Sequence, residues 1–298
     1  MLNKKLIKLG IAPIGWTNDD MPDLGGEITF EQCVSEMALA GFSATEIGNK
    51  YPQKPKVLKA MLKIRKLHVA NSWFSSFILT EDMKKVEKAF RAKCAFLKAL
   101  GAKRVGVSEQ SHSIQGNLKK SVFNDKYVLN DSEWKKLGEG LNRLGQIAQE
   151  YNILLTFHHH MGTVVQTASE IDRLMEITDK NLVFLLFDSG HLAYAGEDYI
   201  VVLKKYIART RHIHLKDVRQ SVIAEVKKNK LSFLDGVRMG TFTVPGDGDI
   251  DFAPLFKIIA DANYAGCLLV EAEQDPAKAN PFEYALKARK YIKKTAGI

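Results

Sequence analysis

The stretch Leu182-Val-Phe-Leu-Leu-Phe-Asp188, followed at once by Ser189-Gly-His191, decides the fold class. Its apolar residues run without alternation into a single aspartate. A short, unbroken apolar run is typical of a strand that is buried on both faces, as in a parallel sheet covered by helices. The aspartate then stands where the strand ends. In a parallel α/β barrel, that end of the strands is the catalytic face.

Three other strand-like runs also end in a side chain that can bind a metal ion. They are residues 153–158, 211–214 and 267–271, which end in His158, His214 and Glu271. Because the carboxyl ends of barrel strands meet on one face, we expect these side chains to lie near Asp188. Two imidazoles and two carboxylates suit a divalent ion such as Mn²⁺ or Co²⁺. We therefore predict a metal site formed by His158, Asp188, His214 and Glu271.

The rest of the chain alternates between strand-like and helical segments, as a barrel requires. Further strands are expected at residues 8–14, 44–47, 68–73 and 103–107. Helices are expected at residues 29–40, 55–67, 81–100, 132–150, 197–209 and 251–262, with others starting at Thr167 or Ser169 and at Pro276 or Pro281. We predict a (β/α)8 TIM barrel that forms a single domain over residues 1–298. The alternative, an open doubly wound sheet, would need a glycine-rich phosphate loop after the first strand, and none is present.

Two long segments interrupt this alternation. Residues 113–131 are polar and have no clear period, and residues 216–249 form the longest interruption. A short extra hairpin around residues 241–244 is expected within the second segment. Long loops in compact domains tend to be functional or mobile. Because residues 216–249 leave the end of the seventh strand, we predict that part of this segment borders or closes the active site.

Polar side chains beside the predicted ligands are candidates for proton transfer. Residues two apart on a strand share a face, so His160 should point the same way as His158, and His159 the opposite way. The candidates are Glu273, His160, His191 and Lys216. A structural role as hydrogen-bonding loop residues is the alternative, and the sequence does not rank the four. Trp16 and Asn18, which follow the first strand, are predicted to contact substrate at the mouth of the barrel, although Trp16 could instead cap the core.

Composition bounds the partners and the compartment. The net charge is +9, and the lysines are scattered over helices, which favours a solvated surface over nucleic-acid binding. Cys33, Cys94 and Cys267 are odd in number and widely spaced, as expected for free thiols in a reducing cytoplasm. No apolar run approaches the roughly 20 residues that span a bilayer, and the first residues do not resemble a signal peptide. We expect a cytoplasmic protein with no nucleic-acid or membrane partner, and we leave homo-oligomer formation open.

Several motifs resemble known families. Phe187-Asp-Ser-Gly-His191, His212-Ile-His-Leu-Lys-Asp217 and Pro245-Gly-Asp-Gly-Asp-Ile-Asp251 resemble the xylose isomerase-like TIM barrels. Ile11-Ala-Pro-Ile-Gly-Trp-Thr-Asn-Asp-Asp20, His158-His-His-Met-Gly-Thr163 and Val270-Glu-Ala-Glu-Gln-Asp-Pro276 are similar to the inosose dehydratase family within that group. Many relatives carry glutamate where this chain has His158. The inosose dehydratases share a histidine there, often followed by proline, and this chain has His159 at that next position.

The resemblance implies a metal-dependent lyase that removes water from 2-keto-myo-inositol, a small polyol ketone, in inositol catabolism. The product would be a trihydroxycyclohexane-dione, and the metal Mn²⁺ or Co²⁺. A sugar epimerase or isomerase of the same group is the main alternative, but epimerisation needs two bases, and a metal-bound His158 could not be one of them. An AP endonuclease would need a larger metal cluster. A metal-binding protein without catalysis is the alternative that is not an enzyme.

Overall fold

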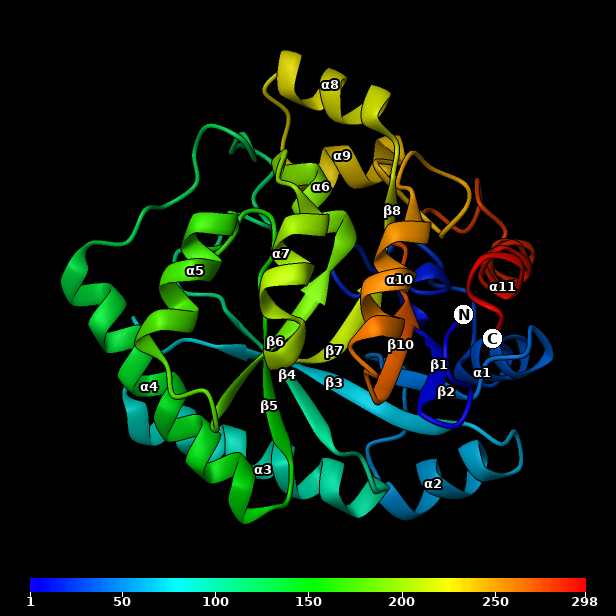
Figure 1. Ribbon diagram of the computed structural model, residues 1–298, viewed down its shortest axis with the longest axis horizontal. Coiled ribbons are helices and arrows are strands. Elements are labelled where there is room, and N and C mark those ends of the chain that lie inside the picture. Colours follow the sequence, from blue (N-terminus) through cyan, green and yellow to red (C-terminus); the bar gives the residue numbers. More distant parts are fainter.

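Eight parallel strands close into a barrel in the computed structural model, which describes residues 1–298 (Figure 1). The order around the barrel is β1-β10-β7-β6-β5-β4-β3-β2. The strands are β1 Ile7–Ile11, β2 Ala44–Ile47, β3 His68–Ser76, β4 Arg104–Glu109, β5 Leu154–His158, β6 Val183–Asp188, β7 Thr210–Leu215 and β10 Gly266–Val270. The predicted TIM barrel is confirmed, and the doubly wound alternative is wrong.

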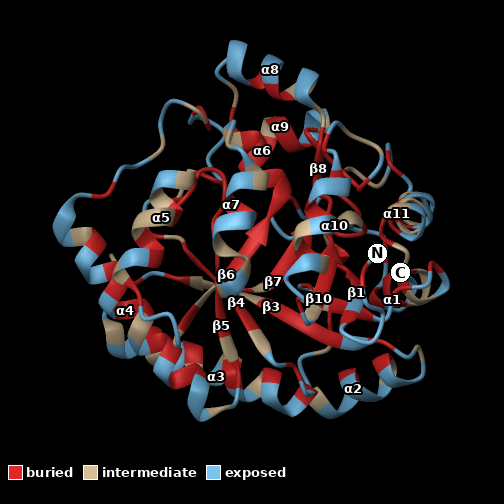
Figure 2. Ribbon diagram, in the orientation of Figure 1, coloured by how far each residue is buried: buried red, intermediate tan, exposed pale blue.

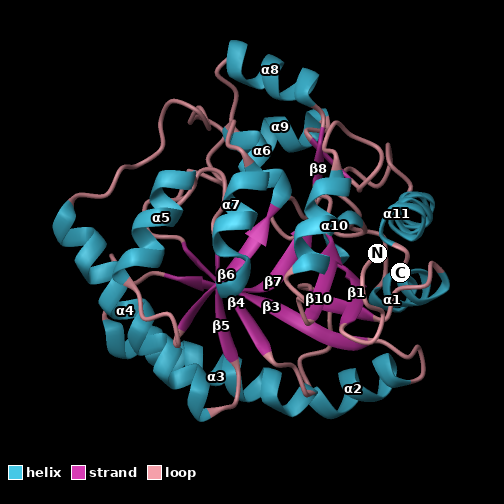
Figure 3. Cartoon of the chain, viewed as in Figure 1, coloured by secondary structure: helices cyan, strands magenta, loops and turns pink.

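Helices ring the outside of the barrel (Figure 3). The helices of this ring are α1 Phe30–Leu39, α2 Pro55–Lys63, α3 Met83–Leu100, α4 Asp131–Glu150, α5 Ala168–Ile177, α7 Tyr199–Tyr206, α10 Phe252–Asp261 and α11 Pro281–Ala296. Short 3-10 turns occur at η1 Pro13–Gly15 and η2 Ile207–Arg209. The last helix packs beside α1, so the two chain ends lie near each other (Figure 1). None of the helices is long and apolar enough to span a membrane.

Burial of apolar side chains between the strands and the outer helices forms the main core. This core contains 78 buried residues, and each helix exposes its outer face (Figure 2). Side chains that accept hydrogen bonds from the first turn begin most helices. Thr29 caps α1, and Thr167, one of the two predicted start residues with Ser169, caps α5. Asn130, not Ser132, caps α4, because its side chain accepts from the Glu133 backbone N–H in a capping box.

Three local predictions need correction. β3 continues to Ser76 and β4 to Glu109, beyond the strand ends predicted at residues 73 and 107. The buried Glu109 carboxylate accepts hydrogen bonds from Ser76 Oγ at 2.6 Å and from the Ile78 backbone N–H at 3.1 Å, so it holds the loop after β3. The residues after Asp188 form helix α6, Ser189–Ala195, and Asp188 caps it by accepting from the His191 backbone N–H at 2.9 Å.

The segment after β7 contains two additional helices, α8 Gln220–Lys228 and α9 Phe233–Met239 (Figure 3). The predicted strand near residue 242 exists as β9 Phe242–Thr243, but it does not form a local hairpin. It pairs antiparallel with β8 Asp217–Val218, from the start of the same segment. The Asp217 carboxylate also accepts from the backbone N–H groups of Gly246, Gly248 and Ile250. This segment is therefore an ordered subdomain attached to the barrel rim.

Candidate active site

The four predicted metal ligands meet at the carboxyl end of the barrel. They come from β5, β6, β7 and the residue directly after β10. Asp188 Oδ2 lies 3.4 Å from His158 Nε2 and 3.3 Å from His214 Nδ1. His214 Nδ1 also lies 2.6 Å from Glu271 Oε2. All four side chains are buried. The structure thus brings together every residue of the predicted set.

These atoms form a donor set that can hold a divalent cation. The ligating atoms of His158, Asp188 and His214 all lie within 4.8 Å of one another. Both ring nitrogens of His158 are buried without a hydrogen-bond partner. Burial lowers the pKa of His158, so the ring is neutral and offers a lone pair. Imidazoles and carboxylates without a thiolate are typical ligands of hard to borderline divalent ions.

A proton occupies part of this donor set when no ion is bound. Burial lowers the pKa of His214, but the carboxylates of Glu271 and Glu46 raise it well above its usual value. Burial raises the pKa of Glu271, but His214 and Lys216 hold it at about 2. A cation can bind His214 only after the facing nitrogen loses its proton. Cation binding should therefore release a proton and strengthen as the pH rises.

Lys216 is a fully buried cation whose three hydrogens all have acceptors. Its Nζ lies 2.8 Å from Glu271 Oε1, 2.8 Å from Glu273 Oε1 and 3.0 Å from His191 Nε2. Burial lowers the pKa of Lys216, but the surrounding carboxylates raise it above its usual value. An ammonium group donates and cannot accept, so His191 must accept at Nε2. Lys216 and His191 lie behind the carboxylates, and neither lines the cavity described below.

The other two candidates for proton transfer, Glu273 and His160, do line the cavity. Glu273 Oε1 is held by Lys216, whereas Oε2 is buried without a partner. Burial raises the pKa of Glu273 to about 7. His160 Nδ1 lies 2.8 Å from the Met161 carbonyl, which can only accept, so Nδ1 carries the hydrogen and Nε2 a lone pair. A bound molecule can therefore reach Glu273 and His160 but not the other two.

The histidine run and the excursion after β7 enclose the site from behind. His159 points away from the cavity, as predicted, and its Nε2 accepts from the Asp188 backbone N–H at 3.2 Å. The buried Phe233 ring of α9 lies 5.2 Å from the His160 ring, between centroids. The Phe242 ring of β9 lies 5.2 Å from the His191 ring and 4.6 Å from Lys216 Nζ. The segment 216–249 thus packs against the cluster, but none of its residues lines the cavity.

A cavity of about 480 Å³ opens above these side chains. Its wall is mostly polar, and it includes Asp19, Asp20, Asn49, Asn71, Gln110 and Gln115. Gln115 Nε2 donates to Asp20 Oδ2 at 2.7 Å, which joins the polar 113–131 segment to the loop after β1. Many donors and acceptors in a cavity of this size suit a small molecule rich in hydroxyl groups.

Trp16 and Asn18 are not among the residues that line this cavity. The 3-10 turn Pro13–Gly15 directs Trp16 into the core, where it is 1% exposed and its Nε1 donates to Glu36 Oε2 at 2.6 Å. Asn18 Oδ1 accepts from the backbone N–H groups of Asp20 and Met21, so it shapes the loop. The predicted direct contact of both residues with substrate is therefore corrected.

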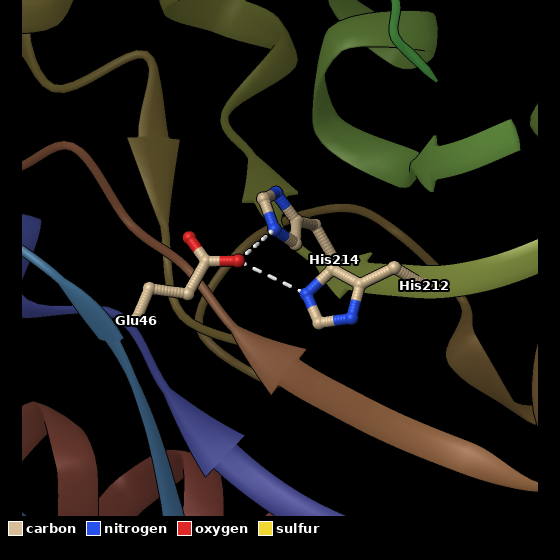
Figure 4. Close-up of side chains that lie close together, drawn as sticks. All are labelled: Glu46, His212 and His214. Carbon is tan, nitrogen blue, oxygen red and sulfur yellow. Dashed lines mark hydrogen bonds and ion pairs between the residues drawn. The ribbon is translucent and has the colours of Figure 1, made fainter. Parts of the chain in front are cut away.

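Glu46 is the main member of the cluster that the sequence interpretation missed. Its Oε1 lies 3.0 Å from both His212 Nε2 and His214 Nε2 (Figure 4). It also accepts from Asn71 Nδ2 at 2.8 Å. Glu46 lies near the end of β2, where a polar strand end on the catalytic face could have suggested a role. The strand has only four residues and no long apolar run, so its signal is weaker than that of β6.

Comparison with known proteins gives a consistent family. The sequence profile described as "Xylose isomerase-like TIM barrel" matches residues 34–295. A protein named inosose dehydratase from Clostridium perfringens is 63% identical over 292 residues, which is 98% of this chain and 98% of that protein. Another inosose dehydratase, from Clostridium botulinum, is 58% identical over the full length of both chains.

Solved structures share the fold at lower identity. A probable 3-DHS dehydratase from Bacillus anthracis superposes with a TM-score of 0.72 at 13% identity, covering 96% of this chain and 98% of that one. The IOLI protein with a bound zinc atom superposes with a TM-score of 0.71 at 16% identity, covering 97% of this chain and 98% of that one. At these identities the likeness establishes the barrel alone.

Proposed function

Because the chain belongs to the inosose dehydratase family of xylose isomerase-like TIM barrels, we propose that it is a hydro-lyase that dehydrates 2-keto-myo-inositol to a trihydroxycyclohexane-dione. The observation that carries this proposal is the cavity-facing Glu273 carboxylate beside a donor set for a divalent ion.

We propose that His158, Asp188, His214 and Glu271 hold the ion, and that it is Mn²⁺ or Co²⁺. The partner-free nitrogens of His158 and the mixed donor set support this assignment. When bound, the ion would polarise a substrate carbonyl and make the neighbouring C–H group more acidic. The zinc in the IOLI structure supports a metal site in this fold and leaves the identity of the ion to measurement.

Glu273 is proposed as the group that transfers the proton. Glu273 lines the cavity, its Oε2 has no hydrogen-bond partner and its pKa is about 7, so the carboxylate can accept a proton at neutral pH and return it. The carboxylate would remove the hydrogen from the carbon beside the ketone. The same group, now protonated, would give that proton to the β-hydroxyl as it leaves as water. The enol that remains ketonises to the dione, so all atoms balance.

The neighbouring residues are proposed to orient Glu273 and the substrate. Lys216 holds Glu273 Oε1 and leaves Oε2 without a protein partner. His160 presents an unprotonated Nε2, so it would accept a hydrogen bond from a substrate hydroxyl rather than supply a proton. His191 would keep Lys216 in place through its own acceptor nitrogen.

Three carboxylates of the histidine cluster line the cavity, Glu46, Glu271 and Glu273, and only Glu273 has a raised pKa, at about 7. A single carboxylate of this kind favours elimination over epimerisation. Epimerisation needs a proton acceptor on each face of the same carbon, whereas elimination through Glu273 needs one group on one face. The second carboxylate on the β10 side, Glu271, is bonded to Lys216 and His214 and has a pKa of about 2. It is therefore a poor second base.

We also propose a cytoplasmic location, which the three buried free cysteines support.

The test is turnover by purified protein loaded with Mn²⁺ or Co²⁺. We expect 2-keto-myo-inositol to yield the dione, detected by NMR, and a ketohexose of similar size to remain unchanged. Epimerisation of the ketohexose without dione formation from the inosose would overturn the proposal.

A further inference from the structure

One partly buried carboxylate outside the proposed ligand set, Glu46, connects two histidines of β7. Glu46 Oε1 lies 3.0 Å from His212 Nε2 and 3.0 Å from His214 Nε2, and Figure 4 shows both rings directed at this one oxygen. Asn71 Nδ2 donates to the same atom at 2.8 Å. The Glu46 side chain is only 13% exposed. Three groups from two other strands therefore fix its position.

The chemistry of these groups determines where the hydrogens lie. Asn71 Nδ2 can only donate, so Glu46 Oε1 acts as an acceptor at the point where the two histidine Nε2 atoms also face it. Each histidine must then carry its hydrogen on Nε2. For His214, the nitrogen on the other side of the ring, Nδ1, faces Asp188 Oδ2 at 3.3 Å and Glu271 Oε2 at 2.6 Å.

We propose that Glu46 is a positioning residue for the metal site: it holds the Nε2 hydrogen of His214 and thereby presents Nδ1 to the ion. This inference rests on the metal site proposed above. A ligating histidine usually donates its other ring N–H to an acceptor that fixes its tautomer and orientation. His212 serves as a second anchor that keeps Glu46 Oε1 between the two rings.

The backbone around Glu46 favours this arrangement. The register between β2 and β3 shifts between Thr45 and Glu46, which is a bulge-like irregularity. Bulges are common beside active sites, where they redirect a side chain. In β4, Gly106 leaves room for the amide of Asn71, because a Cβ at this position would lie 2.7 Å from Asn71 Nδ2. Backbone geometry from two strands thus supports the placement of one carboxylate.

The experiment compares Glu46→Gln and Glu46→Ala with a matched control, Glu109→Gln. Glu109 is likewise a strand-end carboxylate and is fully buried, but its hydrogen-bond partners are Ser76 Oγ and backbone groups, and no histidine is among them. Zinc affinity is measured by chelator competition without substrate. We expect roughly tenfold weaker binding for Glu46→Gln and up to about a hundredfold for Glu46→Ala, with Glu109→Gln within about twofold of wild type.

A second measurement needs no Glu46 variant. Long-range ¹⁵N–¹H NMR of the zinc-loaded wild type, with His214 assigned by comparison with His214→Gln, should report a protonated Nε2 and a metal-bound Nδ1. A His214 ring bound through Nε2 would overturn the inference, as would Glu46 variants with unchanged zinc affinity. Neither readout uses inosose, so failure of the proposed reaction would be distinguishable from failure of this inference.

Discussion

Replacement of Glu273 by glutamine removes one proton-transfer group and preserves its shape. The glutamine carbonyl can still accept from Lys216, which lies 2.8 Å from Glu273 Oε1, and Lys216 keeps its contact with Glu271. General acid–base catalysis contributes about 10²- to 10⁴-fold to a rate. Because Glu273 is proposed to both remove and return the proton, we expect kcat to fall by about 10³- to 10⁴-fold, or about 4 to 5.5 kcal/mol, with KM nearly unchanged.

The assay follows dione formation from 2-keto-myo-inositol across a pH series. The carboxylate is the active form, so kcat/KM should fall as the pH drops through the pKa of Glu273. That pKa is about 7 without metal, and a bound cation should move it lower by favouring the charged form. A Glu273→Gln enzyme with kcat within tenfold of wild type, or one that keeps the acidic limb unchanged, would refute the role of Glu273.

Further predictions concern the metal, the packing behind the site and the cavity mouth. The purified protein should bind about one divalent ion per chain. Asp188→Ala or His214→Ala should abolish metal binding while the circular dichroism spectrum stays unchanged. Full metal content in either variant would contradict the proposed ligand set. Phe233→Ala should lower the free energy of unfolding by about 3–5 kcal/mol, which a denaturant titration measures. It should also lower kcat by roughly tenfold or more, because the His160 ring loses the packing that holds it in position, and enzyme kinetics test this effect. Gln115→Ala should raise KM by about tenfold, because the charge-assisted bond to Asp20 is worth about 1.5–3 kcal/mol; an unchanged KM would exclude this bond from substrate binding.

The sequence was sufficient to predict the barrel and the metal cluster because their signals are local. An apolar run that ends in Asp188, and similar runs before His158 and Glu271, identify a buried strand and its catalytic end together. The run before His214 contains only one apolar residue, Ile213, and is identified by its place in the alternation of strands and helices. Because strands that alternate with helices form a parallel barrel, the four residues at the strand ends share its carboxyl-terminal face. Glu46 escaped this reasoning because β2 has no comparable apolar run.

Other features depend on contacts between distant segments. Trp16 turns into the core because Glu36, in α1, accepts its indole hydrogen. The roles of the four proton-transfer candidates depend on the contacts of Lys216, whose hydrogens are directed at Glu271, Glu273 and His191. Likewise, the partner of β9 lies more than 20 residues earlier in the chain. Sequence spacing alone carries none of this information.

Incubation of 2-keto-myo-inositol with metal-loaded enzyme in deuterated water tests the central claim most directly. If Glu273 removes the proton and water then leaves, NMR should report accumulation of the dione with loss of the β-hydroxyl. Glu273→Gln should abolish this signal. A stereoisomeric inosose that carries deuterium at the α-carbon, with no dione formed, would contradict the account, because it would show proton return to carbon in place of elimination.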